Sequence, residues 1–197
     1  MRTLLLGATL LACSVAHADI GVYFADGFGG AAYRGQLSHY SDGDIRMMMG
    51  LGIRRDNDVL FISGAMNGGL FEYDCYGTEC DSELSAEFGT FSVDFRKRIP
   101  LLYMNRLFSE GTYEHPVLSL ELGGGPRWNW GDFGSSSGVV YGNGPGLGVN
   151  ATLSADLWVI GYYLQAGLDV QHFDLDDGRT VRGSTPYILF GAKAGWM

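Results

Sequence analysis

The chain contains few basic residues for its length. Its 197 residues include 13 Lys and Arg against 22 Asp and Glu, which gives a formal net charge of −9. Binding of nucleic acid without sequence preference depends on a broad cationic surface that neutralises phosphates. The charge balance therefore argues against a nucleic-acid partner, and the length suits one domain.

Long hydrophobic runs are missing after residue 18. Residues 133–155 carry no charge, but Gly, Pro, Ser and Asn interrupt them, and the apolar segment 157–168 holds only 12 residues. A membrane-spanning helix needs about 20 predominantly apolar residues, so this chain can cross a bilayer only as a closed β-barrel. The 31 glycines also favour β structure, because glycine destabilises helix interiors and is tolerated where strands pack closely.

The first 18 residues have the features of a secretory signal peptide. Arg2 supplies the positive start, an apolar stretch follows, and small residues precede a cleavage site after Ala18. We therefore expect residues 1–18 to be removed and residues 19–197 to form the mature domain. The alternative is a lipoprotein-like cleavage before Cys13, with lipid attached to that cysteine.

Only three cysteines occur, and two of them would remain after export. Cys75 and Cys80 lie close together in a polar segment, and an exported chain can keep a disulfide. We expect these two to form a disulfide that braces a hairpin tip. Metal binding is the weaker alternative because no His lies nearby.

Apolar and polar residues alternate along several segments, as in half-buried strands. One apolar stripe consists of Ile45, Met47, Met49, Leu51 and Ile53, and another of Trp158, Ile160, Tyr162, Leu164, Ala166, Leu168 and Val170. Several segments reach the ~9–11 residues of a tilted membrane strand, whereas soluble strands usually have about 5–6. Aromatic residues such as Trp128 and Trp196 stand near the ends of the stripes, as in the aromatic girdles of membrane barrels. The pattern predicts an all-β, antiparallel transmembrane β-barrel.

Turn signals divide the chain into eight predicted strands. Their spans are 29–41, 44–55, 58–73, 82–97, 115–131, 138–153, 156–174 and 184–197. The apolar phase changes within 82–97, which predicts a β-bulge near Gly89. Residues 20–25 and 99–113 do not fit. The first segment predicts a short extra strand, and the second predicts either a one- or two-turn helix after Pro100 or another strand; two extra strands would make ten.

The other face of the predicted strands carries glycines and charges of both signs. The candidate lumen network consists of Arg46, Arg54, Glu87, Glu121, Arg127, Asp169 and Lys193. A soluble carrier barrel would line its interior with apolar residues, so these charges favour lipid on the outside. Because eight-stranded barrels are usually just filled by side chains, we interpret the network as a plug, with a pore lining as the alternative.

The start of the mature chain contains a series of short motifs. These are Asp19-Ile20-Gly21-Val22 with Phe24, then Gly35, His39, Asp42-Gly43-Asp44 and Gly50-Leu51-Gly52. In these motifs the chain resembles the YfaZ family of small outer-membrane proteins, and the remainder shares the pattern of OmpA, OmpX and OmpW. The resemblance implies the outer membrane of a Gram-negative cell, with outer-membrane lipid, lipopolysaccharide and the barrel-assembly machinery as partners. Trp196 is followed by Met197, which departs from the terminal aromatic of those proteins.

Little in the sequence indicates catalysis. His39-Tyr40-Ser41 is similar to the His-x-Ser motif of outer-membrane lipid A deacylases, but Asp42 stands where they have Asn, and Ser and Asp are common turn formers. We expect a monomer without enzymatic activity, metal or cofactor, acting structurally or as a surface-interaction module. The alternatives are a narrow porin-like channel, a lipid A-modifying enzyme and a soluble periplasmic carrier.

Overall fold

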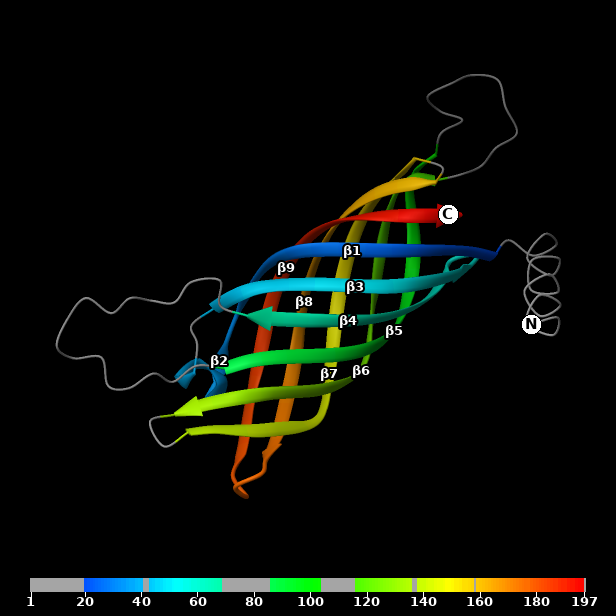
Figure 1. Cartoon of the computed structure of the whole chain (residues 1–197). Coiled ribbons are helices and arrows are strands. Elements are labelled where there is room, and N and C mark those ends of the chain that lie inside the picture. The colour runs from blue at the N-terminus through cyan, green and yellow to red at the C-terminus, as the bar shows by residue number, and fades with distance from the viewer. Residues whose placement is uncertain are drawn as a thin grey trace, which may run out of the picture.

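Eight long strands, each joined to the next in the chain, form the body of the protein (Figure 1). The computed structural model describes residues 20–40, 43–68, 86–103, 116–135, 138–157 and 159–196. The long strands are β1 (Ile20–Ala32), β3 (Gly43–Arg55), β4 (Asp58–Gly68), β5 (Ala86–Tyr103), β6 (Pro116–Ser135), β7 (Gly138–Leu157), β8 (Ile160–Leu175) and β9 (Thr180–Trp196). A two-residue strand, β2 (Arg34–Gly35), and the 3-10 helix η1 (Gln36–His39) lie between β1 and β3.

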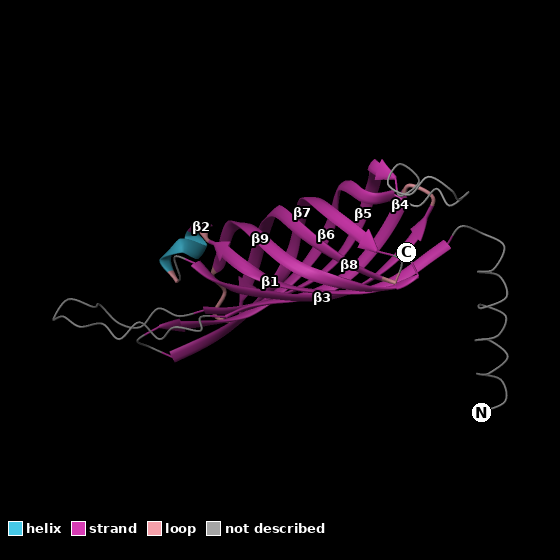
Figure 2. Ribbon diagram, turned by 90° about the horizontal axis from the view of Figure 1, so that it is seen from above, coloured by secondary structure: helices cyan, strands magenta, loops and turns pink. Residues whose placement is uncertain are grey.

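Antiparallel pairing closes these strands into a ring. Each long strand pairs with its neighbours in the chain, and β1 pairs with β9 from Val22 opposite Trp196 to Ala31 opposite Tyr187. Figure 2 shows the strands winding obliquely around the barrel. The predicted eight-stranded antiparallel barrel is confirmed. The ten-stranded alternative is wrong for the ring that the structure describes, because residues 20–25 belong to β1, and β5 runs on to Tyr103 and pairs directly with β6. Residues 104–113 lie outside the described residues.

The first strand was the least accurately predicted. Its predicted span, 29–41, covers only the end of β1 together with β2 and η1. Asp26 and the glycines after it interrupt the apolar alternation, which hides the strand in the sequence. Gly29 is needed there, because a Cβ at this position would collide with the backbone carbonyl of Ile188 on β9. The glycine thus allows β1 and β9 to approach and close the ring.

No bulge occurs near Gly89, so that prediction is wrong. Gly89 lies in continuous register opposite Met66 on β4 and Trp130 on β6. A Cβ at Gly89 would collide with the indole of Trp130, so the glycine leaves room for this ring. The apparent change of phase arises because Phe88 points inward although it is apolar. The irregular register of β5 with β6 lies farther along, between Pro100 and Tyr103.

The barrel has two distinct ends. At the termini end, β1 begins, β9 ends, and short turns join β3 to β4 and β7 to β8. At the loop end, β1, β4, β6 and β8 end, β3, β5, β7 and β9 begin, and β2 and η1 lie between β1 and β3 (Figure 1). The candidate signal peptide and the Cys75–Cys80 pair lie outside the described residues. Within the described ranges, no helix is long and apolar enough to cross a membrane.

Candidate functional site

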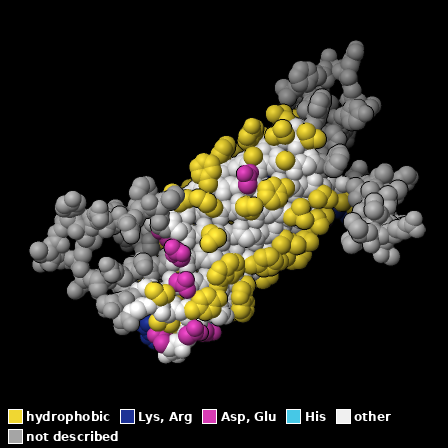
Figure 3. All heavy atoms as spheres, in the orientation of Figure 1, with side chains coloured by type: hydrophobic (Ala, Val, Ile, Leu, Met, Phe, Trp, Pro, Cys, Tyr) yellow, Lys and Arg dark blue, Asp and Glu magenta, His cyan; other side chains and the backbone are white. Residues whose placement is uncertain are grey.

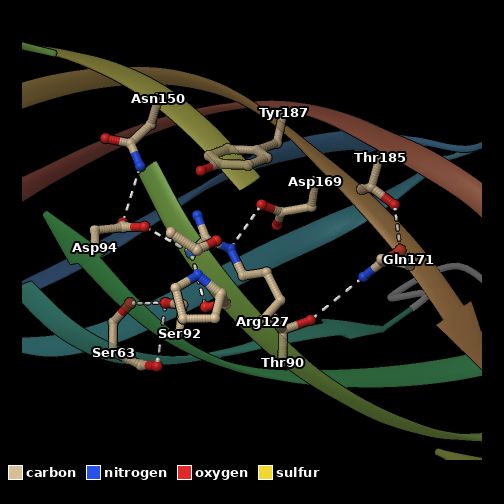
Figure 4. Close-up of polar contacts among 12 residues, drawn as sticks. Ser63, Thr90, Ser92, Asp94, Arg127, Asn150, Asp169, Gln171, Thr185 and Tyr187 are labelled. Carbon is tan, nitrogen blue, oxygen red and sulfur yellow. Dashed lines mark hydrogen bonds and ion pairs between the residues drawn. The ribbon is translucent and has the colours of Figure 1, made fainter. Parts of the chain in front are cut away.

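A continuous series of oppositely charged side chains occupies the barrel interior. It begins with Arg46 on β3, whose Nη2 lies 2.7 Å from Asp169 Oδ2. The other oxygen of Asp169 accepts a hydrogen bond from Arg127 Nε at 2.9 Å, and Arg127 Nη1 donates to Asp94 Oδ1 at 2.6 Å. Figure 4 shows Arg127 reaching between Asp94 and Asp169. Strands on opposite sides of the ring are thus joined by charge-assisted hydrogen bonds, which are stronger than neutral ones.

The series continues toward the termini end. Arg96 Nη2 lies 2.9 Å from Asp94 Oδ2, and its Nη1 lies 3.6 Å from Glu121 Oε2. Glu121 Oε1 accepts a hydrogen bond from Lys193 Nζ at 3.2 Å, and Lys193 also approaches Asp156 Oδ1 at 3.6 Å. The last contact joins Arg98 Nη2 to Asp156 Oδ2 at 2.7 Å. We call these nine residues the ion-pair chain: Arg46, Asp94, Arg96, Arg98, Glu121, Arg127, Asp156, Asp169 and Lys193.

Burial makes the pairing within the ion-pair chain necessary. Each of its nine residues is at most 7% exposed. An unpaired charge removed from water is very costly, and the cost is offset only where partners and hydrogen bonds surround it. Five cations and four anions alternate along the series. Every member therefore has at least one opposite charge beside it.

Aromatic rings pack against the cations of the ion-pair chain. The guanidinium of Arg46 lies 4.2 Å from the ring centre of Tyr187, and that of Arg96 lies 4.2 Å from the ring centre of Phe61. Lys193 Nζ lies 5.0 Å from the ring of Tyr23. These cation–π contacts link the charges to an apolar half of the interior, built mainly on β1, β3, β4, β8 and β9. The space across the barrel is filled from both sides.

A layer of neutral hydrogen bonds lies beside the ion-pair chain. Gln171 Nε2 donates to Asn129 Oδ1 at 3.2 Å and approaches Thr90 Oγ1 at 3.4 Å. Thr185 Oγ1 donates to Gln171 Oε1 at 2.7 Å. These four residues come from β5, β6, β8 and β9, so the layer spans the barrel.

The loop end of the interior is apolar. Phe88, Phe133 and Phe173 pack around one another with ring centres 5.1 to 5.4 Å apart. Tyr33 stacks edge-on against Phe88, and Tyr40 against Phe133, both from the segment between β1 and β3. We call this group the loop-end cluster; it consists of Tyr33, Leu37, Phe88, Phe133, Phe173, Leu175 and Val181. η1 turns the chain so that Leu37, which is fully buried, closes over the rings.

Glycines on β7 make room for both regions. A Cβ at Gly148 would collide with Asp169 and Arg127, and one at Gly142 would collide with Leu175. Near the loop end, β7 therefore has no side chains on its inward face at these glycines, and bulky side chains of β6 and β8 fill the space next to its backbone. The glycine-rich stretch of β7 serves packing, as its position on a lumen face predicts.

The seven predicted network residues have three different placements. Five of them, Arg46, Glu121, Arg127, Asp169 and Lys193, belong to the ion-pair chain. Arg54 is half-buried near the termini end of β3 and forms no ion pair with a described residue. Glu87 is exposed on the outer face of β5, so its predicted inward position is wrong. It points outward because Phe88 occupies the inward position next to it.

Four members of the ion-pair chain escaped prediction: Asp94, Arg96, Arg98 and Asp156. A signal for three of them exists on β5, where Phe91, Val93 and Phe95 alternate with polar residues and form an apolar stripe. Continuing that phase places Asp94, Arg96 and Arg98 on the inner face. His39, from the deacylase-like motif, is exposed, and its companions Ser41 and Asp42 lie outside the described residues. In the part of the chain that the structure describes, no group of three or more His, Cys, Asp or Glu side chains is arranged to hold a metal ion.

The outer face of the barrel carries a broad apolar belt. Large side chains that are more than half exposed include Phe28, Met49, Phe95, Leu147 and Phe190. Apolar side chains spread over the middle of the face shown in Figure 3, whereas acidic side chains gather toward the loop end. Asp26 is an exposed exception in the middle of β1.

The polarity of the two faces reverses at the loop end. Outward charges there neighbour inward rings in sequence: Glu87 and Phe88 on β5, Asp132 and Phe133 on β6, and Asp174 and Phe173 on β8. In the middle of the barrel the outer face is apolar and the inner face is charged. At the loop end the arrangement is that of a water-soluble protein, with apolar residues inside and charges outside.

Solved structures of outer-membrane proteins share this fold, among them the following two. The crystal structure of Neisserial surface protein A (NspA) matches with a TM-score of 0.63 at 8% identity, covering 89% of this chain and 97% of that chain. A major outer membrane protein from Thermus thermophilus matches with a TM-score of 0.51 at 12% identity, covering 89% of this chain and 99% of that chain. No family model and no curated protein matches the chain. The similarity is therefore one of fold, and the resemblance to the YfaZ family stays a prediction.

Proposed function

We propose that the protein spans the outer membrane as a non-conducting β-barrel and presents its loop end as a structural or surface-interaction module. The reversal of polarity at the loop end carries this proposal. An apolar outer face is stable only against lipid or another apolar surface, and a charged outer face with an apolar interior is stable in water. The reversal on β5, β6 and β8 then marks the boundary between membrane and water.

The dimensions of the apolar belt support a membrane-spanning position. On the outer face of β5, Gly89, Phe91, Val93 and Phe95 lie between Glu87 and Lys97, and Ile99 and Leu101 continue the apolar face beyond Lys97. A tilted strand crosses the hydrocarbon core in ~9–11 residues. Trp128 and Tyr162 are half exposed on the same outer face, in keeping with the aromatic girdles of membrane barrels. In that orientation the termini end faces the periplasm and the loop end faces outward.

The filled interior favours a plug over a pore. An ion crossing the barrel would have to separate the pairs of the ion-pair chain and displace the rings of the loop-end cluster. Both obstacles are buried and mutually bonded. A narrow porin-like channel is therefore the less favoured alternative.

The surface-interaction role agrees with the similar fold of NspA, which is named a surface protein. Outer-membrane lipid, lipopolysaccharide and the barrel-assembly machinery are the expected partners, and we expect a monomer without cofactor. The protein is not proposed to be an enzyme, because His39 is exposed in a short 3-10 helix and forms no side-chain hydrogen bond with a described residue. A YfaZ-like identity rests on the motifs of the mature start alone.

Conductance of the folded barrel tests the proposal. Purified mature protein would be refolded into planar lipid bilayers, with heat-dependent gel mobility as the criterion of folding. We expect a folded, inserted protein without discrete conductance steps, next to a general porin that serves as a positive control. Reproducible current steps would contradict the plug, and failure to insert would contradict the membrane location.

Mass spectrometry of lipid A tests the alternative that the protein is a lipid A-modifying enzyme. Lipopolysaccharide incubated with the folded protein should keep its acyl chains. Loss of an acyl chain that disappears in the Ser41→Ala variant would establish catalysis and contradict the proposed role.

A further inference from the structure

We propose that the outer face near the termini end binds one anionic glycerophospholipid, with its phosphodiester at Arg55 and its acyl chain along β4 and β5. The inference rests on the proposed membrane location, because only then does this face meet lipid. It assigns a ligand to a groove on the outer wall that shares only Arg96 with the ion-pair chain and no residue with the loop-end cluster.

The groove lies on the outer wall of the barrel, across β3 to β6. It has a volume of about 520 Å³ and is lined by Ile53, Arg55, Asp58, Val59, Leu60, Phe95, Arg96, Lys97 and Leu122. This volume falls within the range of small-molecule sites. A groove of this kind accepts a lipid chain more tightly than a flat, evenly packed barrel wall does, because more apolar surface is covered per chain.

Two rows of side chains give the groove its polarity. In the first row, Ile53 lies opposite Leu60, and Leu60 lies opposite Phe95. The second row lies two residues nearer the termini end, where Arg55 is opposite Asp58 and Asp58 is opposite Lys97. On β3 and β4 the apolar row therefore ends in a charged row at their turn, which matches the order of acyl chain and headgroup in one lipid molecule; on β5 the apolar residues Ile99 and Leu101 follow Lys97.

The charged row leaves one cation available for a phosphate. Lys97 Nζ lies 2.8 Å from Asp58 Oδ1, so these two charges largely compensate each other. Arg55 is exposed and forms no ion pair with any described residue. Its planar guanidinium can bind a phosphodiester through two parallel hydrogen bonds.

The net charge of this row favours an anionic headgroup. Among the exposed charged side chains that line the groove, Arg55 and Lys97 are positive and Asp58 is negative; Asp56 in the adjoining turn does not line it. A zwitterionic headgroup adds an ammonium that Arg55 repels, whereas a headgroup such as phosphatidylglycerol adds none. A basic residue near the membrane surface contributes about fivefold in affinity for anionic lipid.

Lipid retention measures this preference. The full mature protein would be refolded into bilayers of equal phosphatidylglycerol and phosphatidylethanolamine, extracted in mild detergent, and its bound lipids quantified by mass spectrometry. We expect phosphatidylglycerol to be enriched about fivefold in the wild type. In Arg55→Gln the retained lipids should approach the composition of the bilayer.

Two further variants separate the groove from general effects of charge. Arg34→Gln removes an exposed cation at the loop end and should keep the enrichment. Leu60→Trp fills the groove without changing any charge and should reduce the amount of lipid retained. Absence of enrichment in an inserted wild type, or equal loss in Arg34→Gln, would overturn the inference and leave the proposed function intact. A protein that does not insert would overturn both.

Discussion

The ion-pair chain and the loop-end cluster fill the same barrel with opposite chemistry. The first consists of buried charges held by their partners, and the second of aromatic and aliphatic side chains held by packing. The interiors differ because the outer faces of the strands differ: the outer face is apolar beside the ion-pair chain and carries charges beside the loop-end cluster. Because side chains alternate between the two faces, a strand with apolar residues outside has its polar positions inside, and a strand with charges outside can turn its rings inward.

The two regions should also fail in different ways. Removing one member of the ion-pair chain leaves the neighbouring charge buried without compensation, whereas truncating a ring in the loop-end cluster leaves a cavity. Substitutions in the two regions therefore test separate physical terms.

The largest effect is expected for Asp169→Ala. Asp169 is fully buried and bonds both Arg46 and Arg127, so its loss leaves two guanidinium groups with less compensation. The free energy of unfolding in lipid vesicles, measured by denaturant titration of tryptophan fluorescence, should fall by about 3–5 kcal/mol. Asp177→Ala in the exposed β8–β9 turn removes a pair with Arg179 and should change the free energy of unfolding much less, because solvent screens an exposed ion pair. Equal losses in the two variants would mean that the ion-pair chain is not required for stability.

A somewhat smaller effect is expected for Phe133→Ala. Its ring contacts Phe88, Phe173 and Tyr40, and truncation leaves a cavity at the loop end. The same titration should show a loss of about 3 kcal/mol. Val139→Ala, an exposed position on the outer face of β7, is the matched control and should change little. Phe133→Ala should show no conductance steps in planar bilayers, because the ion-pair chain still fills the barrel. A steady current would show that the loop-end cluster alone closes the barrel.

The third effect is the coupling between Glu121 and Lys193. Each has a second partner, Arg96 for Glu121 and Asp156 for Lys193. Replacing both Glu121 and Lys193 by Met removes one bonded pair. Arg96 then remains paired with Asp94, and Asp156 remains paired with Arg98. In a double-mutant cycle the double variant should lose about 2 kcal/mol less than the sum of the single variants. Strict additivity would indicate that the two side chains are stabilised independently.

The middle of the barrel was more predictable from sequence than its loop end. Alternation in the segments around Met49 and Leu164 indicated the outer face, and the charges on the opposite face indicated Arg46, Arg127 and Asp169 as inward residues. This works because most outward positions in the middle are apolar and the buried charges lie on the inward face. Asp26 outside and apolar side chains such as Phe61 inside are exceptions.

The same rule fails where the strands leave the apolar belt. Phe88 follows Glu87 in sequence. If apolar residues are assumed to face outward, Phe88 is placed outside and Glu87 in the lumen, and the change of phase after Phe88 is interpreted as a bulge. The hydrophobic pattern records which face is buried, but it does not tell whether lipid or protein covers that face. The sequence also does not predict which charged residues pair inside the barrel, because a contact such as that between Arg46 and Asp169 joins positions far apart in the chain.

The smallest effect concerns the outer face and has the opposite sign. Asp26 is exposed in the middle of β1, between the outward rings of Phe24 and Phe28. A carboxylate facing lipid destabilises a barrel, but less than the ~2–4 kcal/mol of a midplane Arg or Lys, so Asp26→Leu should raise the free energy of unfolding in vesicles by about 1 kcal/mol. Asp132→Leu changes an outward carboxylate at the loop end, which lies on the water side of the proposed boundary, and should give no such gain. If both substitutions stabilised equally, lipid would reach the loop end, and the boundary inferred from the reversal of polarity would be wrong; a gain confined to Asp26→Leu requires that the two regions of the barrel face different solvents.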